Sequence, residues 1–114
     1  MISMCDEQNQ PIFSSLSGEG KGVLKLVIKF VEQLPMCLEE IRHLFDAGDW
    51  DKLASSVHKL KGTGGNFGFI ELSKVAESIE LLSSEKSYDD VKAQLDLLDN
   101  LQSRIQAGAK QYKL

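Results

Sequence analysis

The sequence predicts an all-α fold, an antiparallel up-and-down four-helix bundle with a short N-terminal extension. Apolar residues recur at spacings of three and four over four separate segments, which is the period of one helix face. Short polar or glycine-containing breaks separate these segments, and no segment alternates with the two-residue period of a strand. Amphipathic helices joined by short connections pack as antiparallel neighbours in a bundle.

The first helix is expected over residues 22–47. Its apolar stripe consists of Val27, Val31, Leu34, Leu38, Ile41 and Phe45. Pro35 interrupts the stretch, and a proline inside a helix costs about 3 kcal/mol because it has no N–H to donate and clashes with the preceding turn. The stripe keeps its phase across Pro35, which favours one kinked helix over two helices that meet near Leu34. Ala47 and Gly48 are expected to end the helix.

Three further helices are expected over residues 49–65, 69–84 and 88–107. Asp49 is a suitable N-cap for the first of these, and Ser87, with Asp90 three residues later, is suitable for the last. The residues expected to face the core are Trp50, Leu53, Val57, Leu60, Leu72, Val75, Ile79, Leu82, Val91, Leu95, Leu98, Leu101 and Ile105.

The domain organisation is predicted as an N-terminal extension over residues 1–20 and a helical bundle over residues 21–114. Residues 1–10 are polar and are expected to be loose. A short helix is expected near 12–17, where apolar side chains would cover one end of the core.

Composition and charge exclude several classes of protein. The chain has 114 residues, enough for one domain, and 42% of them are hydrophobic. The formal net charge of -4 argues against a nucleic-acid binder, which usually has a basic excess. The longest apolar stretch contains Lys25 and Lys29 and is too short to span a bilayer, and the N-terminus does not resemble a signal peptide. The two cysteines form no disulfide framework, which favours a cytoplasmic location.

The second predicted helix carries a group of residues whose side chains are suited to a chemical reaction. His58 lies about 100° round the helix from Val57, at the edge of the buried stripe. Four residues at helical spacing share its face: Ala54, Lys61, Gly62 and Gly65. A neutral imidazole with a free ring nitrogen is a nucleophile, and a phosphoryl group on His58 would lie within reach of the Lys61 ammonium.

The glycines at positions 62, 64 and 65 need an explanation, since each costs about 1 kcal/mol in a helix interior relative to alanine. Their missing side chains would let another backbone or a flat partner surface approach closely. The ordinary alternatives stay open at this point. His58 and Lys61 could be solvated surface residues, and Gly64 and Gly65 could simply end the helix.

The stretch His58-Lys59-Leu60-Lys61-Gly62 resembles the histidine-containing phosphotransfer (HPt) domain family, in which the phospho-accepting histidine is followed by x-Leu-Lys-Gly. The resemblance extends over about residues 23–82 through Phe30, Leu34-Pro35, Gly48-Asp49, Leu53, Asn66-Phe67-Gly68, Leu72, Val75 and Ile79-Glu80. Two departures are small. Lys59 stands where an uncharged residue is more usual, and residues 62–65 are richer in glycine than is typical.

The resemblance implies a role for each site residue. His58 would accept the phosphoryl group, Lys61 would stabilise it, and Glu80 would hydrogen-bond the other ring nitrogen and orient the ring. A solvent-facing Glu80 is the alternative. The surface on which a partner docks would comprise Ala54, Ser55, Lys59, Gly62 and Gly65. The implied function is a phosphocarrier in a two-component phosphorelay, and the implied partners are receiver domains of response regulators or of a hybrid histidine kinase.

The sequence contains no ATP-binding G-x-x-x-x-G-K-[ST] motif and no acidic cluster for magnesium. We therefore expect a carrier and not an enzyme, with no cofactor or metal of its own; the receiver domain would supply the aspartate and the magnesium. The carrier is expected to be a monomer. A non-catalytic helical interaction module is the alternative function. A haem or di-metal bundle is a weaker one, because C-x-x-C-H and paired E-x-x-H motifs are missing.

Overall fold

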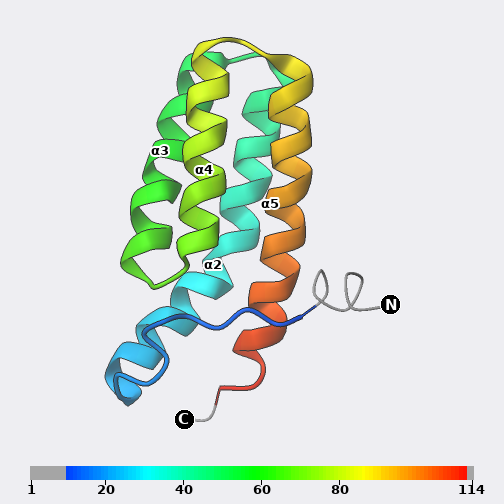
Figure 1. Cartoon of the computed structure of the whole chain (residues 1–114). Coiled ribbons are helices and arrows are strands. Elements are labelled where there is room, and N and C mark those ends of the chain that lie inside the picture. Colours follow the sequence, from blue (N-terminus) through cyan, green and yellow to red (C-terminus); the bar gives the residue numbers. More distant parts are fainter. Residues whose placement is uncertain (1–9, 113–114) are drawn as a thin grey trace.

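The computed structural model describes residues 10–112, which form four helices and, within that range, no strand. The helices are α2 (Lys21–Asp46), α3 (Trp50–Asn66), α4 (Ile70–Ser84) and α5 (Tyr88–Ala109). They run up and down as an antiparallel bundle in which α2 also packs against α5 and so closes the ring (Figure 1). The predicted four-helix fold is confirmed, and each predicted helix boundary lies within a few residues of the observed one.

Helix α2 continues without a break through Pro35. The alternative of two helices meeting near Leu34 is therefore wrong. Figure 1 shows the blue N-terminal part of α2 leaning away from the rest of the bundle. Apolar side chains before and after the proline are buried, among them Val31, Leu34 and Leu38. Their packing offsets the cost of the missing backbone hydrogen bond, because tertiary contacts supply most of the stability of a helix in a protein.

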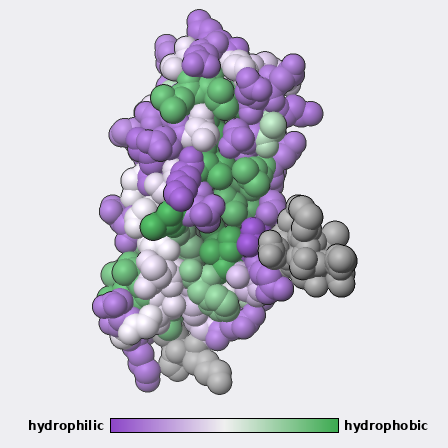
Figure 2. All heavy atoms as spheres, viewed as in Figure 1, coloured by the Kyte–Doolittle hydropathy of each residue, from purple (hydrophilic) through white to green (hydrophobic). Residues whose placement is uncertain are grey.

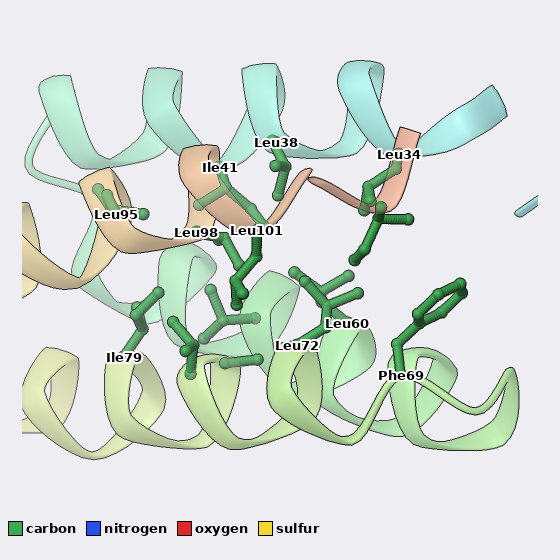
Figure 3. Packing of buried hydrophobic residues seen from close by; sticks show 14 of the residues in the cluster. Leu34, Leu38, Ile41, Leu60, Phe69, Leu72, Ile79, Leu95, Leu98 and Leu101 are labelled. Carbon is green, nitrogen blue, oxygen red and sulfur yellow. The ribbon is translucent and has the colours of Figure 1, made fainter. Parts of the chain in front are cut away.

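The four predicted apolar stripes meet in one core (Figure 3). Every residue expected in these stripes is buried except Trp50 and Leu82, which are partly buried and pack against the core. Phe69 was not predicted to be in the core, yet it is only 2% exposed. It lies just before α4, and Phe30 of α2 stacks on both Phe67 and Phe69 with ring centroids 5.0 and 5.9 Å apart. Figure 2 shows hydrophilic residues over most of the outer helix surfaces on one side of the molecule, with apolar atoms visible between the helices.

Glycines in the left-handed region end two of the helices. Gly48 has φ +71° and follows α2, and the Asp49 N–H donates to the Leu44 carbonyl at 3.0 Å. Gly68 has φ +82° and follows α3, and the Phe69 N–H donates to the Gly64 carbonyl at 2.8 Å. Both are Schellman-type ends that satisfy carbonyl groups at the helix terminus.

The two predicted N-caps differ in detail. The Asp49 carboxylate accepts a hydrogen bond from the Lys52 N–H at 3.3 Å, as expected for an N-cap. Ser87 also stands at the N-cap position of α5, but its hydroxyl donates to the Asp90 carboxylate at 2.7 Å and caps no backbone N–H. The contact is a charge-assisted hydrogen bond within the first turn of the helix.

The short helix predicted near 12–17 is not formed. Residues 11–14 have no regular structure, and residues 15–18 form a turn. The backbone of this segment instead pairs with other parts of the molecule, since the Ile12 N–H donates to the Arg104 carbonyl at 2.9 Å. The predicted loose stretch over 1–10 lies almost entirely outside the described residues.

The same segment is also attached to the connection between α3 and α4. The buried Ser14 hydroxyl donates to the Phe67 carbonyl at 2.5 Å, and the Ser15 N–H donates to the Gly68 carbonyl at 3.0 Å. Ile12 and Leu16 pack against the core, as expected, whereas Phe13 is 46% exposed. The segment thus covers one end of the bundle without forming a helix.

We predict that Gly68→Ala lowers the free energy of unfolding by about 1–2 kcal/mol, because an L side chain is disfavoured at this positive φ. The added Cβ would also overlap the Ser14 hydroxyl and lie 2.9 Å from the Ser15 backbone nitrogen. Urea unfolding measures the change. Gly22→Ala is the matched control, since nothing lies within 4 Å of a Cβ there and the variant should be at least as stable as the wild type. Equal stability of the two variants would contradict the prediction.

Candidate functional site

The packing of α3 decides which of its side chains reach solvent. Leu53 and Val57 are 0% exposed and Leu60 is 2% exposed, so the rotation of the helix about its axis is set by the core. His58 follows Val57 and therefore emerges at the edge of the buried face, with 62% of its side chain exposed. The ring is thus supported by the core on one side and accessible to a partner on the other.

A carboxylate on the neighbouring helix holds the His58 ring. The Nδ1 atom of His58 lies 2.9 Å from Oε2 of Glu80, which is on α4. An ionised carboxylate only accepts hydrogen bonds, so this contact places the proton of a neutral ring on Nδ1. The Nε2 atom then keeps its lone pair and is the nitrogen available for attack.

Lys61 shares the same carboxylate. Its Nζ atom lies 3.3 Å from Oε1 of Glu80, while the other oxygen of Glu80 contacts His58. Partial burial by itself would raise the pKa of the Glu80 carboxyl, but hydrogen bonds and charge from Lys61 and His58 outweigh it and hold that pKa below its ordinary value. The three side chains predicted from sequence are therefore brought together, and Glu80 is ionised between a cation and the ring.

The glycines of α3 lie in two different environments. A Cβ at Gly62 would have no atom within 4 Å, so this position is open. Gly64 is buried, and a Cβ there would lie 3.2 Å from the Leu72 side chain of α4. Gly65 is exposed, and a Cβ there would lie 3.6 Å from the Ser73 hydroxyl. Gly64 therefore serves the packing of α3 on α4, whereas Gly62 leaves the surface beside His58 flat.

The residues predicted to form the docking surface lie along the outer side of α3. Ser55, Lys59, Gly62 and Gly65 are exposed, and Ala54 is partly buried. They surround His58 on the same helix, so a flat partner could contact them and the ring together. Their role in docking stays a prediction.

A groove between α2 and α3 borders this surface and was not predicted from sequence. Its volume is about 360 Å³, and the residues that line it include Leu26, Phe30, Cys37, Lys59, Leu60 and Phe67. Leu26 is 57% exposed. Leu26 lies outside the buried stripe of its helix, and this was the one signal of the groove in the sequence. The spacing of apolar residues along a helix does not show where two helices leave a hollow between them.

A second contact between α3 and α4 was also missed. The Ser73 hydroxyl of α4 donates to the backbone carbonyl of Lys61 at 2.9 Å. A serine within a helix gives no sequence pattern that reveals a hydrogen-bond acceptor on another helix.

Within residues 10–112, no group of three or more His, Cys, Asp or Glu side chains could hold a metal ion. Among the helices described, none is long and apolar enough to cross a membrane.

Comparison with protein families agrees with this site. The family model of the Hpt domain matches residues 25–108, which include all four helices almost completely. No curated protein and no solved structure gives a significant match.

The helical bundle and the matched region define the class of protein: the chain belongs to the Hpt domain family. Domains of this family are phosphotransfer carriers of two-component signalling relays. The resemblance inferred from the residues around His58 is therefore confirmed at the level of the family.

The lowered pKa of Glu80 predicts how stability depends on pH. A carboxyl with a folded-state pKa below its unfolded value stabilises the fold fully above the unfolded value, about 4.3, and loses that contribution as pH falls through the folded value. The wild type should exceed Glu80→Gln in free energy of unfolding by at most about 1 kcal/mol, since the pair is partly exposed.

Urea unfolding of both proteins between about pH 3 and pH 6 measures this difference. It should be largest at the upper end of that range and shrink on acidification. A difference that grows as the pH is lowered would show that Glu80 is not held as a carboxylate by Lys61 and His58.

Proposed function

We propose that the chain is a phosphocarrier that accepts a phosphoryl group on His58 from a receiver-domain aspartate and passes it to another receiver domain. The observation that carries this proposal is the geometry of the ring. His58 is 62% exposed, and its Nδ1 atom is held at 2.9 Å by Glu80, so that Nε2 is free and accessible.

The transfer step requires little chemistry from this chain. The Nε2 lone pair attacks the phosphorus of an aspartyl phosphate, the bond between phosphorus and the aspartate oxygen breaks, and the aspartate leaves as a carboxylate. The ring keeps its Nδ1 proton and becomes positively charged, and the nearby Glu80 carboxylate stabilises that charge. The reverse reaction delivers the phosphoryl group to a second receiver.

Lys61 is placed to stabilise the transferred group. Its side chain is 31% exposed and lies one helical turn beyond His58, where a compact cation can turn from Glu80 to a phosphoryl oxygen. Catalysis of phosphoryl transfer is mainly positioning and charge stabilisation. The chain thus supplies the nucleophile and one cation, and we propose that the receiver supplies the aspartate and a magnesium ion.

We propose that the receiver covers the exposed surface of α3 around Gly62. Lys59 belongs both to this surface and to the lining of the α2–α3 groove, so a partner seated over His58 would also cover the apolar mouth of the groove. The absence of an ATP-binding motif in the sequence favours a carrier over an enzyme. The monomeric state stays a prediction, and so do a cytoplasmic location and the lack of nucleic-acid binding.

A non-catalytic interaction module would use the same bundle and the same groove. It would have no need for an exposed imidazole held by a carboxylate, or for a lysine on the other oxygen of that carboxylate. Incubation with a panel of phosphorylated receiver domains separates the two functions, because only a carrier becomes labelled.

We predict that His58→Gln abolishes labelling by phosphorylated receivers, since an amide is not a comparable nucleophile. Lys61→Ala should slow transfer about tenfold, as expected for loss of a partly screened, charge-assisted contact of 1–2 kcal/mol. Rapid-quench measurement of phosphoryl transfer gives both values. His43→Gln, which changes an exposed histidine on α2, is the control and should be labelled like the wild type. Labelling of His58→Gln would place the acceptor elsewhere.

We predict that Gly62→Leu blocks transfer sterically while the protein stays folded. Nothing lies within 4 Å of a Cβ at this position, so the leucine is accommodated, and it gains helix propensity over glycine. Circular dichroism and rapid-quench transfer test the two effects. Gly65→Leu should also reduce transfer, whereas Ala93→Leu on the exposed side of α5 should not. Transfer by Gly62→Leu at the wild-type rate would contradict close approach of the receiver to α3.

A further inference from the structure

Lys61 is attached to α4 at two points. Its backbone carbonyl accepts a hydrogen bond from the Ser73 hydroxyl at 2.9 Å, and its side-chain ammonium lies 3.3 Å from the Glu80 carboxylate. Ser73 and Glu80 are seven residues apart, which is about two helical turns, and so they lie on the same face of α4. That face is the one turned toward α3.

The close approach of the two helices makes the Ser73 contact possible. A Cβ at Gly64 would lie 3.2 Å from the Leu72 side chain, a distance at which the neighbour has to move, and a Cβ at Gly65 would lie 3.6 Å from the Ser73 hydroxyl. Side-chain hydrogen bonds to a backbone carbonyl reach only about 3 Å, so the Ser73 contact requires α3 and α4 to lie close together.

Interlocking side chains already limit sliding of α4 along α3, as Leu72 does against Gly64. The Ser73 hydroxyl adds a polar constraint to this packing. A hydrogen bond is directional, and it weakens steeply when the angle at the hydrogen falls below about 120°. The Ser73 to Lys61 contact therefore opposes such a slide at a point two turns from Glu80.

We propose that Ser73 is a positioning residue for phosphotransfer. It holds α4 in the register at which the Glu80 carboxylate meets Nδ1 of His58 and Nζ of Lys61 together. Ser73 touches neither the ring nor the phosphoryl group, and its effect on the site passes through Glu80. This inference rests on the proposed phosphocarrier function for its kinetic consequence, but its structural consequence is measurable in the unphosphorylated protein.

The first experiment measures the His58 ring by ¹⁵N NMR in the wild type, Ser73→Ala, Ser73→Thr and Ser78→Ala. The Nδ1–H tautomer should decrease in Ser73→Ala, whereas Ser73→Thr, which keeps a hydroxyl, should restore it. Ser78→Ala changes another partly buried serine of α4 and should match the wild type. An unchanged tautomer and ring pKa in Ser73→Ala would overturn the proposal.

The second experiment is a double-mutant cycle on the transfer rate. Ser73→Ala should slow transfer about threefold, as expected for the loss of one ordinary hydrogen bond. In a Glu80→Ala background the same change should have almost no further effect, because the residue through which Ser73 acts is already missing. An equal loss in both backgrounds would show that Ser73 acts independently of Glu80 and would overturn the positioning role.

The two experiments also separate this inference from the function on which it rests. If the wild type accepts no phosphoryl group from any receiver, the phosphocarrier function fails, and the ring tautomer still decides whether Ser73 positions Glu80. If transfer occurs and the tautomer does not respond to Ser73→Ala, the positioning role alone is wrong.

Discussion

The close contact between α3 and α4 is the constraint on which the site depends. Gly64 is buried against Leu72, and this glycine lets the two helices approach until polar side chains of one reach the other. Glycine destabilises a helix interior by about 1 kcal/mol relative to alanine. Gly64 therefore lowers the intrinsic stability of α3 but permits its close contact with α4. The contact places a carboxylate of α4 within 2.9 Å of an exposed ring on α3.

Glu80 carries the electrostatics of this arrangement. One of its oxygens contacts the imidazole ring of His58, and the other contacts the ammonium group of Lys61. A carboxylate in this position sets the tautomer of the imidazole, and in the proposed function it would offset the positive charge that develops when Nε2 forms a bond to phosphorus. The same carboxylate holds the Lys61 ammonium beside the ring. Orientation of the ring and placement of the ammonium therefore have one common cause.

The remainder of the molecule supports the α3–α4 pair and leaves its outer side open. The core fixes the rotation of α3, since Leu53 and Val57 are completely buried on the side opposite to solvent. Residues 10–17 attach to the α3–α4 connection and to α5, which closes the end of the bundle nearest Gly68. A well-packed helix pair with an open surface at Gly62 suits the proposed function, in which the chemistry takes place between two partners rather than inside a cavity.

The amino-acid sequence by itself determined the four helices, the stripes that meet in the core and the identity of the candidate site residues. These features follow from helical periodicity and from the local motif around His58, both of which are properties of neighbouring residues in the chain. The N-terminal segment was predicted wrongly as a short helix, because its backbone partners at Arg104 and Gly68 are distant in sequence. The tertiary structure alone decided which glycine serves a helix contact and which is open. It also decided that Ser73 meets Lys61 and that α2 and α3 leave a groove. Such features depend on how closely two helices approach and in what register, and no pattern within a single helix contains that information.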